Sequence, residues 1–195
     1  MGKIVISTNA SLDGVVQDPD GMEGFKLGGW FGRSGGADLE AWGEIEHAEA
    51  MGAGALLMGR RSYAWFAQRW ASREGAWAQR LRSLPKYVVS STLEDPEWAN
   101  VTVLAGEAAD EVARLKREVD GEIVVYASYR LGRVLVDHGL VDELRLFVFP
   151  VVLGAGQRLF GETGGERPLR LVGSRTVGAG ITQLTYEFVG DLEKP

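Results

Sequence analysis

Short apolar segments alternate with amphipathic stretches along the first two thirds of the chain, and no other feature constrains the fold as strongly. Apolar and β-branched residues cluster in five segments that predict buried strands: 3–9, 55–58, 86–90, 101–104 and 122–126. In the intervening and following stretches, apolar residues recur every three to four positions, which predicts helices with one buried face. These stretches begin at Leu39, Trp77, Ala108 and Leu131. Strands that alternate with helices indicate a largely parallel sheet with helices on both faces.

The last third of the chain changes to a period of two. Residues 144–149 and 183–188 alternate with this period and have an apolar residue at every second position, which predicts strands with one buried face. The Gly178-Ala179-Gly180 segment is a candidate turn that would pair 169–177 with the last strand. Antiparallel strands at one edge of a parallel sheet explain this pattern. The predicted fold is therefore a single α/β domain over 1–195, with three layers and a mostly parallel mixed sheet that has antiparallel C-terminal strands.

Composition argues against several classes of function. The formal charge is −6 and no basic block occurs, which argues against nucleic acid as a partner. No apolar run is long enough to span a membrane, and the N-terminal residues form a predicted strand rather than a signal peptide. The chain has no cysteine and two histidines, His47 and His138, so we expect neither disulfides nor a metal site. These features predict a cytoplasmic protein.

Residues 21–36 are rich in glycine and have no clear period, and we interpret them as a long loop. Long ordered loops are often functional, although a plain surface excursion is about as common. Six tryptophans suggest a large core. Trp30 is the one that we expect to face a pocket, because it lies in this loop.

Three strand-to-helix junctions carry the candidate chemistry. The first, 59–63, combines a glycine, two arginines and a hydroxyl at a predicted helix start, where phosphate groups bind well. The second, 90–92, has three successive hydroxyls, and the third, 125–131, has small residues before a helix. Each junction alone is explained as well by an ordinary turn or cap. Together they would line one crevice suited to a dinucleotide, although the Gly-x-Gly-x-x-Gly fingerprint is absent.

The chain offers little for acid–base or nucleophilic catalysis. It has no Gly-x-Ser-x-Gly elbow and no His-Glu-x-x-His helix. Asp13, in Ser11-Leu12-Asp13-Gly14, follows the first strand and is either a turn residue or a polar contact to a ligand. The lack of a strong base is consistent with hydride transfer, because there the cofactor carries the difficult chemistry.

In this order, the segments resemble the dihydrofolate-reductase-like family, and most of all the branch related to the C-terminal reductase domain of bacterial riboflavin biosynthesis. The likeness spans residues 3–189. Its most specific part runs from Gly-Leu-Val-Asp-Glu at 139–143 to Leu-Gly-Ala-Gly at 153–156. The other similar segments are 11–14, 56–63, 88–91, 123–131 and 159–160.

The resemblance implies that the chain binds NADPH, and it assigns a role to each matching residue. Those expected near the adenosine phosphates are Gly59, Arg60, Arg61, Ser62, Ser90 and Ser91. Those expected to cradle the pyrophosphate are Ala127, Ser128, Tyr129 and Leu131. Those expected to border the nicotinamide are Asn9, Ala10, Val16 and Gln17. Asp13 is expected to face the substrate or the cofactor ribose as the catalytic residue.

One position departs from the family pattern. The family usually has glycine where this chain has Ala127, so the added methyl group is expected to crowd the pyrophosphate and weaken binding by about 1 kcal/mol. A carboxylate that would anchor a pterin cannot be singled out among Asp38, Glu40 and Glu44, since each is equally well a solvated helix residue. A zinc deaminase domain is not expected, because its metal site needs cysteine.

The resulting hypothesis is an NADPH-dependent reductase that transfers a hydride to a small heterocyclic substrate, pterin-like or ribosylaminopyrimidine-like. The paired arginines favour NADPH over NADH, since a guanidinium group matches a phosphate. The alternative is a non-catalytic nucleotide-binding oligomeric protein that keeps the fold. We also expect a homodimer in which Phe147 and Phe149 pack across a two-fold axis, although a helix of the same subunit would cover them equally well.

Overall fold

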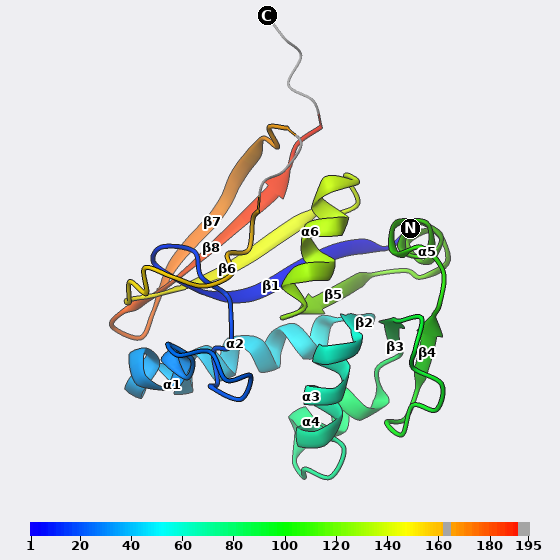
Figure 1. The fold of residues 1–195 in the computed structure, drawn as a ribbon, viewed down its shortest axis with the longest axis horizontal. Helices are drawn as coiled ribbons and strands as arrows, with labels where there is room; N and C mark the ends of the chain where they lie inside the picture. Colours follow the sequence, from blue (N-terminus) through cyan, green and yellow to red (C-terminus); the bar gives the residue numbers. More distant parts are fainter. Residues whose placement is uncertain (162–164, 191–195) are drawn as a thin grey trace, which may run out of the picture.

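The computed structural model describes residues 1–161 and 165–190, and its centre is an eight-stranded sheet (Figure 1). The order across the sheet is β4-β3-β2-β5-β1-β6-β8-β7. The first six strands in this order, from β4 at the edge to β6, run parallel to one another, whereas β8 is antiparallel to both β6 and β7. This confirms the predicted mixed sheet. The strands are β1 (Lys3–Ser11), β2 (Ala55–Gly59), β3 (Lys86–Val89), β4 (Val101–Leu104), β5 (Glu122–Tyr126), β6 (Glu143–Phe149), β7 (Leu169–Val177) and β8 (Ile181–Phe188).

Helices cover both faces of the parallel part of the sheet. One buried cluster joins α5 and α6 to one face, and a second joins α2, α3 and α4 to the other. The helical segments are α1 (Trp30–Gly35), the short 3-10 helix η1 (Gly36–Asp38), α2 (Leu39–Gly52), α3 (Arg60–Trp70), α4 (Ala76–Ser83), α5 (Ala108–Glu118) and α6 (Tyr129–Asp137). Within the described residues, no helix has the length and apolar character needed to cross a membrane.

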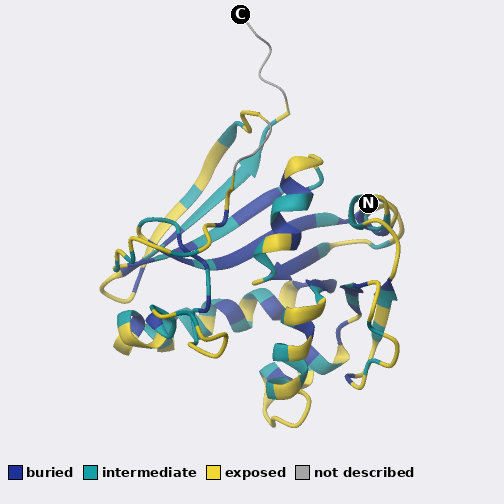
Figure 2. Cartoon of the chain, in the orientation of Figure 1, coloured by how far each residue is buried: buried dark blue, intermediate teal, exposed yellow. Residues whose placement is uncertain are grey.

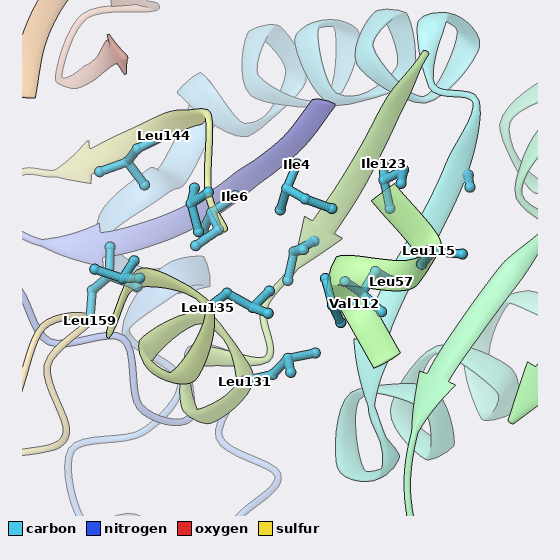
Figure 3. Packing of buried hydrophobic residues seen from close by; sticks show 14 of the residues in the cluster. Ile4, Ile6, Leu57, Val112, Leu115, Ile123, Leu131, Leu135, Leu144 and Leu159 are labelled. Carbon is cyan, nitrogen blue, oxygen red and sulfur yellow. The ribbon is translucent and has the colours of Figure 1, made fainter. Parts of the chain in front are cut away.

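The central strands are buried on both faces because their side chains alternate between the two helix layers. Ile4 and Ile6 of β1 belong to the cluster with Leu135 of α6, and Figure 3 shows these residues in one packed layer. Val5, between them, belongs to the cluster with Leu81 of α4. The same alternation keeps the middle of the sheet dark in Figure 2, where the burial of each residue is shown. The carboxyl ends of these strands are thereby held in a fixed relation.

The predicted long loop over 21–36 is wrong in its second half, because α1 and η1 occupy 30–38. Trp30 begins α1, is fully buried and contacts Phe149 edge-on, with 5.5 Å between ring centroids. Its indole N–H donates to the Gln17 carbonyl at 2.9 Å. The expectation that Trp30 faces a pocket is therefore wrong. Burial of the large ring and a satisfied N–H make it a core residue.

The expected packing of Phe147 and Phe149 across a dimer axis is also wrong. Both side chains are fully buried within the chain itself, in a cluster with Trp30. Phe31 of α1 and Trp42 of α2 make ring contacts with them and cover this part of the sheet. The other interpretation, cover by a helix of the same subunit, is the correct one.

Candidate functional site at the carboxyl ends of the strands

Four segments meet at the carboxyl ends of neighbouring parallel strands, and we call them the rim: 9–11, 59–62, 90–91 and 127–129. They form or follow the ends of β1, β2, β3 and β5, which are consecutive in the sheet in the order β3-β2-β5-β1. The chain leaves β5 into α6 on one face, whereas it leaves β1 and β2 towards α2 and α3 on the other. Strand pairs that diverge in this way mark the ligand-binding position of open α/β sheets. The end of β5 is flanked by two such pairs.

Two hydrogen bonds join the first and third predicted junctions. The Ser128 backbone N–H donates to the Ser62 hydroxyl oxygen at 3.1 Å, and the Gly59 N–H donates to the Ser128 hydroxyl oxygen at 3.2 Å. The starts of α3 and α6 are thus tied together. The residue before each helix makes no capping hydrogen bond with its own side chain, so no cap occupies the N–H groups of the first helical residues. Such groups are suited to oxygens of an anion.

The arginines of the first junction are the first two residues of α3. Arg60 and Arg61 are exposed, and neither makes an ion pair or side-chain hydrogen bond with the described residues. No acidic residue lies in the first turn of α3. The dipole of the helix and two guanidinium groups therefore combine at one point of the rim.

Ala127 and Ser128 both adopt left-handed backbone conformations, each with φ of 50°. A side chain at such a residue costs about 1–2 kcal/mol, which glycine avoids. The position at which the resemblance implies glycine is thus strained in this chain. Tyr129 follows as the first residue of α6, and Leu131 is buried in the core.

The second junction is mainly a turn. The Ser90 hydroxyl oxygen accepts the backbone N–H groups of Thr92 at 3.2 Å and Leu93 at 3.1 Å, so the side chain stabilises its own loop. Ser91 is exposed beside it. A ligand contact at Ser90 and Ser91 stays a prediction.

The residues expected around the nicotinamide lie at the end of β1 and in the segment after it. Ala10 and Val16 are buried in the cluster that includes Leu131. The Gln17 amide oxygen accepts the Gln157 N–H at 3.0 Å, which ties this segment to the following loop. Asn9 is half-buried on the α2 side, where its amide oxygen accepts the Trp42 indole N–H at 2.9 Å.

Asp13 holds a neighbouring loop in place. Its carboxylate accepts the Ser11 hydroxyl at 2.7 Å, the Leu153 N–H at 3.0 Å and the Gly154 N–H at 2.9 Å. These hydrogen bonds, that from Ser11 first, lower the pKa of Asp13 to about 2. Asp13 is therefore ionised at neutral pH, so its carboxylate can accept hydrogen bonds but cannot donate one. Its expected catalytic role is untested.

Comparison with known proteins now adds to this geometry. Residues 2–183 match the family model described as the RibD C-terminal domain. The chain belongs to this family. It is 30% identical over 141 residues to the uncharacterized protein YyaP of Bacillus subtilis, covering 69% of this chain and 74% of that protein. The resemblance noted from the sequence is thereby confirmed.

Solved structures share the fold of this chain. A putative riboflavin biosynthesis protein from Shewanella sp. PV-4 superposes with a TM-score of 0.74 at 22% identity, over 96% of this chain and 99% of that one. Dihydrofolate reductase from Enterococcus faecalis, solved with NADP(H), superposes with a TM-score of 0.61 at 13% identity, over 95% and 96% of the two chains. At these identities the likeness shows the fold alone, which is dihydrofolate-reductase-like as expected.

Several contacts near the site could not be found from the sequence. The Asp20 carboxylate accepts the Trp65 indole N–H at 2.6 Å and pairs with Arg69 at 3.0 Å, which holds the segment before α1 against α3. Asp38, one of the candidate anchor carboxylates, accepts the N–H groups of Ala179 and Gly180 in the β7–β8 turn. These partners are far apart in sequence, so no local pattern could have paired them.

A cavity of about 530 Å³ lies away from the rim, between α2 and the β6-β8-β7 side of the sheet. Arg145 lines it and is paired with Glu49 at 2.8 Å, Glu122 at 2.7 Å and Glu143 at 2.5 Å. Its charge is therefore already balanced by three carboxylates. No group of three metal-binding side chains occurs among the described residues. The rim remains the better candidate for a functional site.

Proposed function

We propose that this protein is an NADPH-dependent reductase that transfers a hydride to a small heterocyclic substrate, either pterin-like or ribosylaminopyrimidine-like. The observation that carries the proposal is that Ser62 and Ser128 join two uncapped helix starts at one point, beside two exposed arginines that pair with none of the described side chains. Membership of the RibD C-terminal domain family supports it. A location in the cytoplasm is part of the same proposal.

The residues present fit a dinucleotide. A Cβ atom at Gly59 would meet no atom within 4 Å, so packing within the protein does not require glycine there. Close approach of a ligand to the backbone supplies a reason for it. Arg60, Arg61 and Ser62 would hold the adenosine phosphate groups, with Ser90 and Ser91 beside them. The backbone at 127–129 would cradle the pyrophosphate; the Ser128 N–H already donates to Ser62, which leaves the N–H groups of its neighbours for this contact.

The nicotinamide would lie against the end of β1, among Asn9, Ala10, Val16 and Gln17. When bound, NADPH supplies the hydride. The chain contributes orientation and exclusion of water at this point. Asp13 would accept a hydrogen bond from a hydroxyl of the substrate or of the ribose, because its carboxyl group is ionised.

Titration with NADPH tests the proposal directly. Binding to the folded state raises the melting temperature by mass action, and the nicotinamide fluorescence changes on binding. We expect both signals at micromolar NADPH, and NADPH oxidation with one member of a panel of dihydropterins and ribosylaminopyrimidines. If both signals are absent at millimolar NADPH, the proposal is refuted.

A second candidate function is a nucleotide-binding protein without turnover. The left-handed conformation of Ala127 favours it, because the strained residue carries a methyl group where the resemblance implies glycine. NADPH binding with no oxidation across the same panel would support this candidate. Turnover of any member of the panel would exclude it.

We further propose a homodimer formed through β7, in place of the packing of Phe147 and Phe149. Strand β7 lies at the edge of the sheet and pairs with β8 alone among the described strands. Leu171 and Val172 on it are 52% and 47% exposed, and Figure 2 shows that much of this strand faces solvent. A two-fold axis would pair this edge with its copy and cover both side chains. Sedimentation should show a dimer for the wild type and a monomer for Leu171→Glu; a wild-type monomer at micromolar concentration would contradict the proposal.

A further inference from the structure

The side chain of Asn9 lies at the point where β1 and β5 separate. β1 and β5 pair from Lys3↔Glu122 to Ser7↔Tyr126, and the chain then turns through Ala127 into α6. β1 continues to Ser11 and pairs only with β6 over this length. Asn9 therefore stands beside the end of β5, at one of the two diverging strand pairs of the rim.

Asn9 faces α2 rather than α6. Val5 and Ser7, four and two positions before it, contact the α2 side, since Val5 packs with Ala50 and the Ser7 hydroxyl lies 3.4 Å from Glu46. Because side chains alternate along a strand, Asn9 continues this row, and its contact with Trp42 of α2 confirms the direction. The side chain is half-buried.

Trp42 determines which end of the Asn9 amide is available. An indole N–H can only donate, so it must meet the amide oxygen of Asn9, as it does at 2.9 Å. The amide nitrogen consequently points away from Trp42. The Asn9 amide nitrogen makes no hydrogen bond with the described residues. It is also not one of the buried polar side-chain atoms that lack a partner among them, so it reaches solvent.

The Trp42 ring is itself held on several sides. Its centroid lies 4.8 Å from that of Phe31, 6.4 Å from that of Phe147 and 6.4 Å from that of Trp77. Phe147 is also the residue of β6 that pairs with Asn9 in the sheet. The indole cannot rotate freely in this cluster, so the orientation of the Asn9 amide is set before any ligand arrives.

We propose that Asn9 donates a hydrogen bond from its amide nitrogen to a carbonyl oxygen of a planar ring bound at the rim, and that Trp42 is the positioning residue that keeps the amide in the donating orientation. The inference rests on the proposed function. The acceptor is the carboxamide of the nicotinamide or a ring carbonyl of the substrate. An amide turned the other way would present its own oxygen to this acceptor and repel it.

The experiment compares dissociation constants for three probes: NADPH, 2′-phospho-ADP-ribose, which lacks the nicotinamide, and 7,8-dihydropterin added to the protein saturated with NADP⁺. The variants are Asn9→Asp, which keeps the shape and the bond to Trp42 but removes the donor, and Asn9→Leu. We expect Asn9→Asp to weaken one carbonyl-bearing probe by about tenfold and to leave 2′-phospho-ADP-ribose within twofold. An effect on NADPH assigns the acceptor to the cofactor, and an effect on dihydropterin alone assigns it to the substrate.

Trp42→Phe should move the same constant in the same direction by about threefold, because the amide then rotates freely. Trp77→Phe is the matched control. It changes the packing around Trp42 but keeps the Trp42 indole N–H, so the dissociation constant should stay unchanged. Melting temperatures of all variants report whether they fold. The inference is overturned if wild-type protein binds NADPH but neither Asn9 variant changes any dissociation constant by more than twofold. It is also overturned if the Asn9 variants weaken the binding of 2′-phospho-ADP-ribose as much as that of the carbonyl-bearing probes. Failure of wild-type protein to bind NADPH would instead refute the proposed function.

Discussion

The Ser128 backbone N–H donates to the Ser62 hydroxyl oxygen across 66 residues of sequence. This bond joins the loop after β5 to the first turn of α3, and the Gly59 N–H to the Ser128 hydroxyl completes the connection. The hydroxyl hydrogens of both serines remain available to an anion, since each oxygen acts as acceptor in these bonds. The relationship therefore sets the spacing between the two helix starts that are expected to bind the coenzyme.

Ser62→Ala should loosen this connection. Loss of the acceptor leaves the Ser128 N–H without its protein partner, so we expect the free energy of unfolding to fall by about 1 kcal/mol and the dissociation constant of NADPH to rise severalfold. Chemical denaturation and fluorescence titration measure the two effects. Ser62→Thr keeps the hydroxyl, and Ser72→Ala removes an exposed hydroxyl outside the rim, so both should behave like wild type. An unchanged Ser62→Ala would show that the bond does not contribute.

Ala127→Gly should stabilise the protein, although glycine usually destabilises. Relief of a left-handed alanine is worth about 1–2 kcal/mol, and the greater freedom of glycine in the unfolded chain offsets about 0.5–1 kcal/mol of that. We expect a net gain of about 0.5–1 kcal/mol in thermal or chemical unfolding, together with tighter NADPH binding. Ala64→Gly, at an exposed helical position of α3, should cost about 1 kcal/mol. Equal losses in both variants would contradict the strain at Ala127.

Arg60→Ala and Arg61→Ala should change the choice of coenzyme. If the exposed guanidinium groups hold the 2′-phosphate, the double variant loses about 10- to 100-fold in affinity for NADPH and little for NADH. Isothermal titration of both coenzymes at two salt concentrations measures this, because the lost contacts are also the salt-sensitive ones. Arg117→Ala, exposed near the end of α5, is the control. Parallel losses for NADPH and NADH would remove the arginines from phosphate selection.

Glu46→Gln should remove a pH dependence of stability. Burial raises the pKa of Glu46 well above its usual 4.5, and the charge of Glu49 adds to this, while Ser7 and Arg145 oppose it. The folded state therefore retains a proton that the unfolded state releases above pH 4.5, so wild-type stability falls as the pH rises towards the folded pKa. Denaturation at pH 5 and pH 8 should show an advantage of Glu46→Gln that grows with pH. Glu44→Gln, exposed on the same helix, should show no such pH-dependent advantage. Parallel stability profiles for Glu46→Gln and wild type would contradict the raised pKa of Glu46.

The strands were predictable because burial leaves a local signature. The segments 101–104 and 122–126 match β4 and β5 residue for residue, and 169–177 matches β7. β1, β2, β6 and β8 extend the predicted segments by one or two residues, whereas β3 ends one residue before its predicted segment does. Trp30 and Phe149 show where local patterns fail, because a glycine-rich segment with large rings looks like a loop until a partner surface is known.

The sequence alone determined the order of the elements, the parallel and antiparallel parts of the sheet, and the glycine and hydroxyl residues at the strand ends. These features depend on periodicity and on backbone preferences over a few residues. Tertiary structure decided which side chains meet: Ser62 with Ser128, Trp42 with Asn9, and Phe149 with Trp30. The physical reason is that the two residues of each pair lie 33 to more than 100 positions apart in the sequence. Only the packing of helices on the sheet brings them into contact.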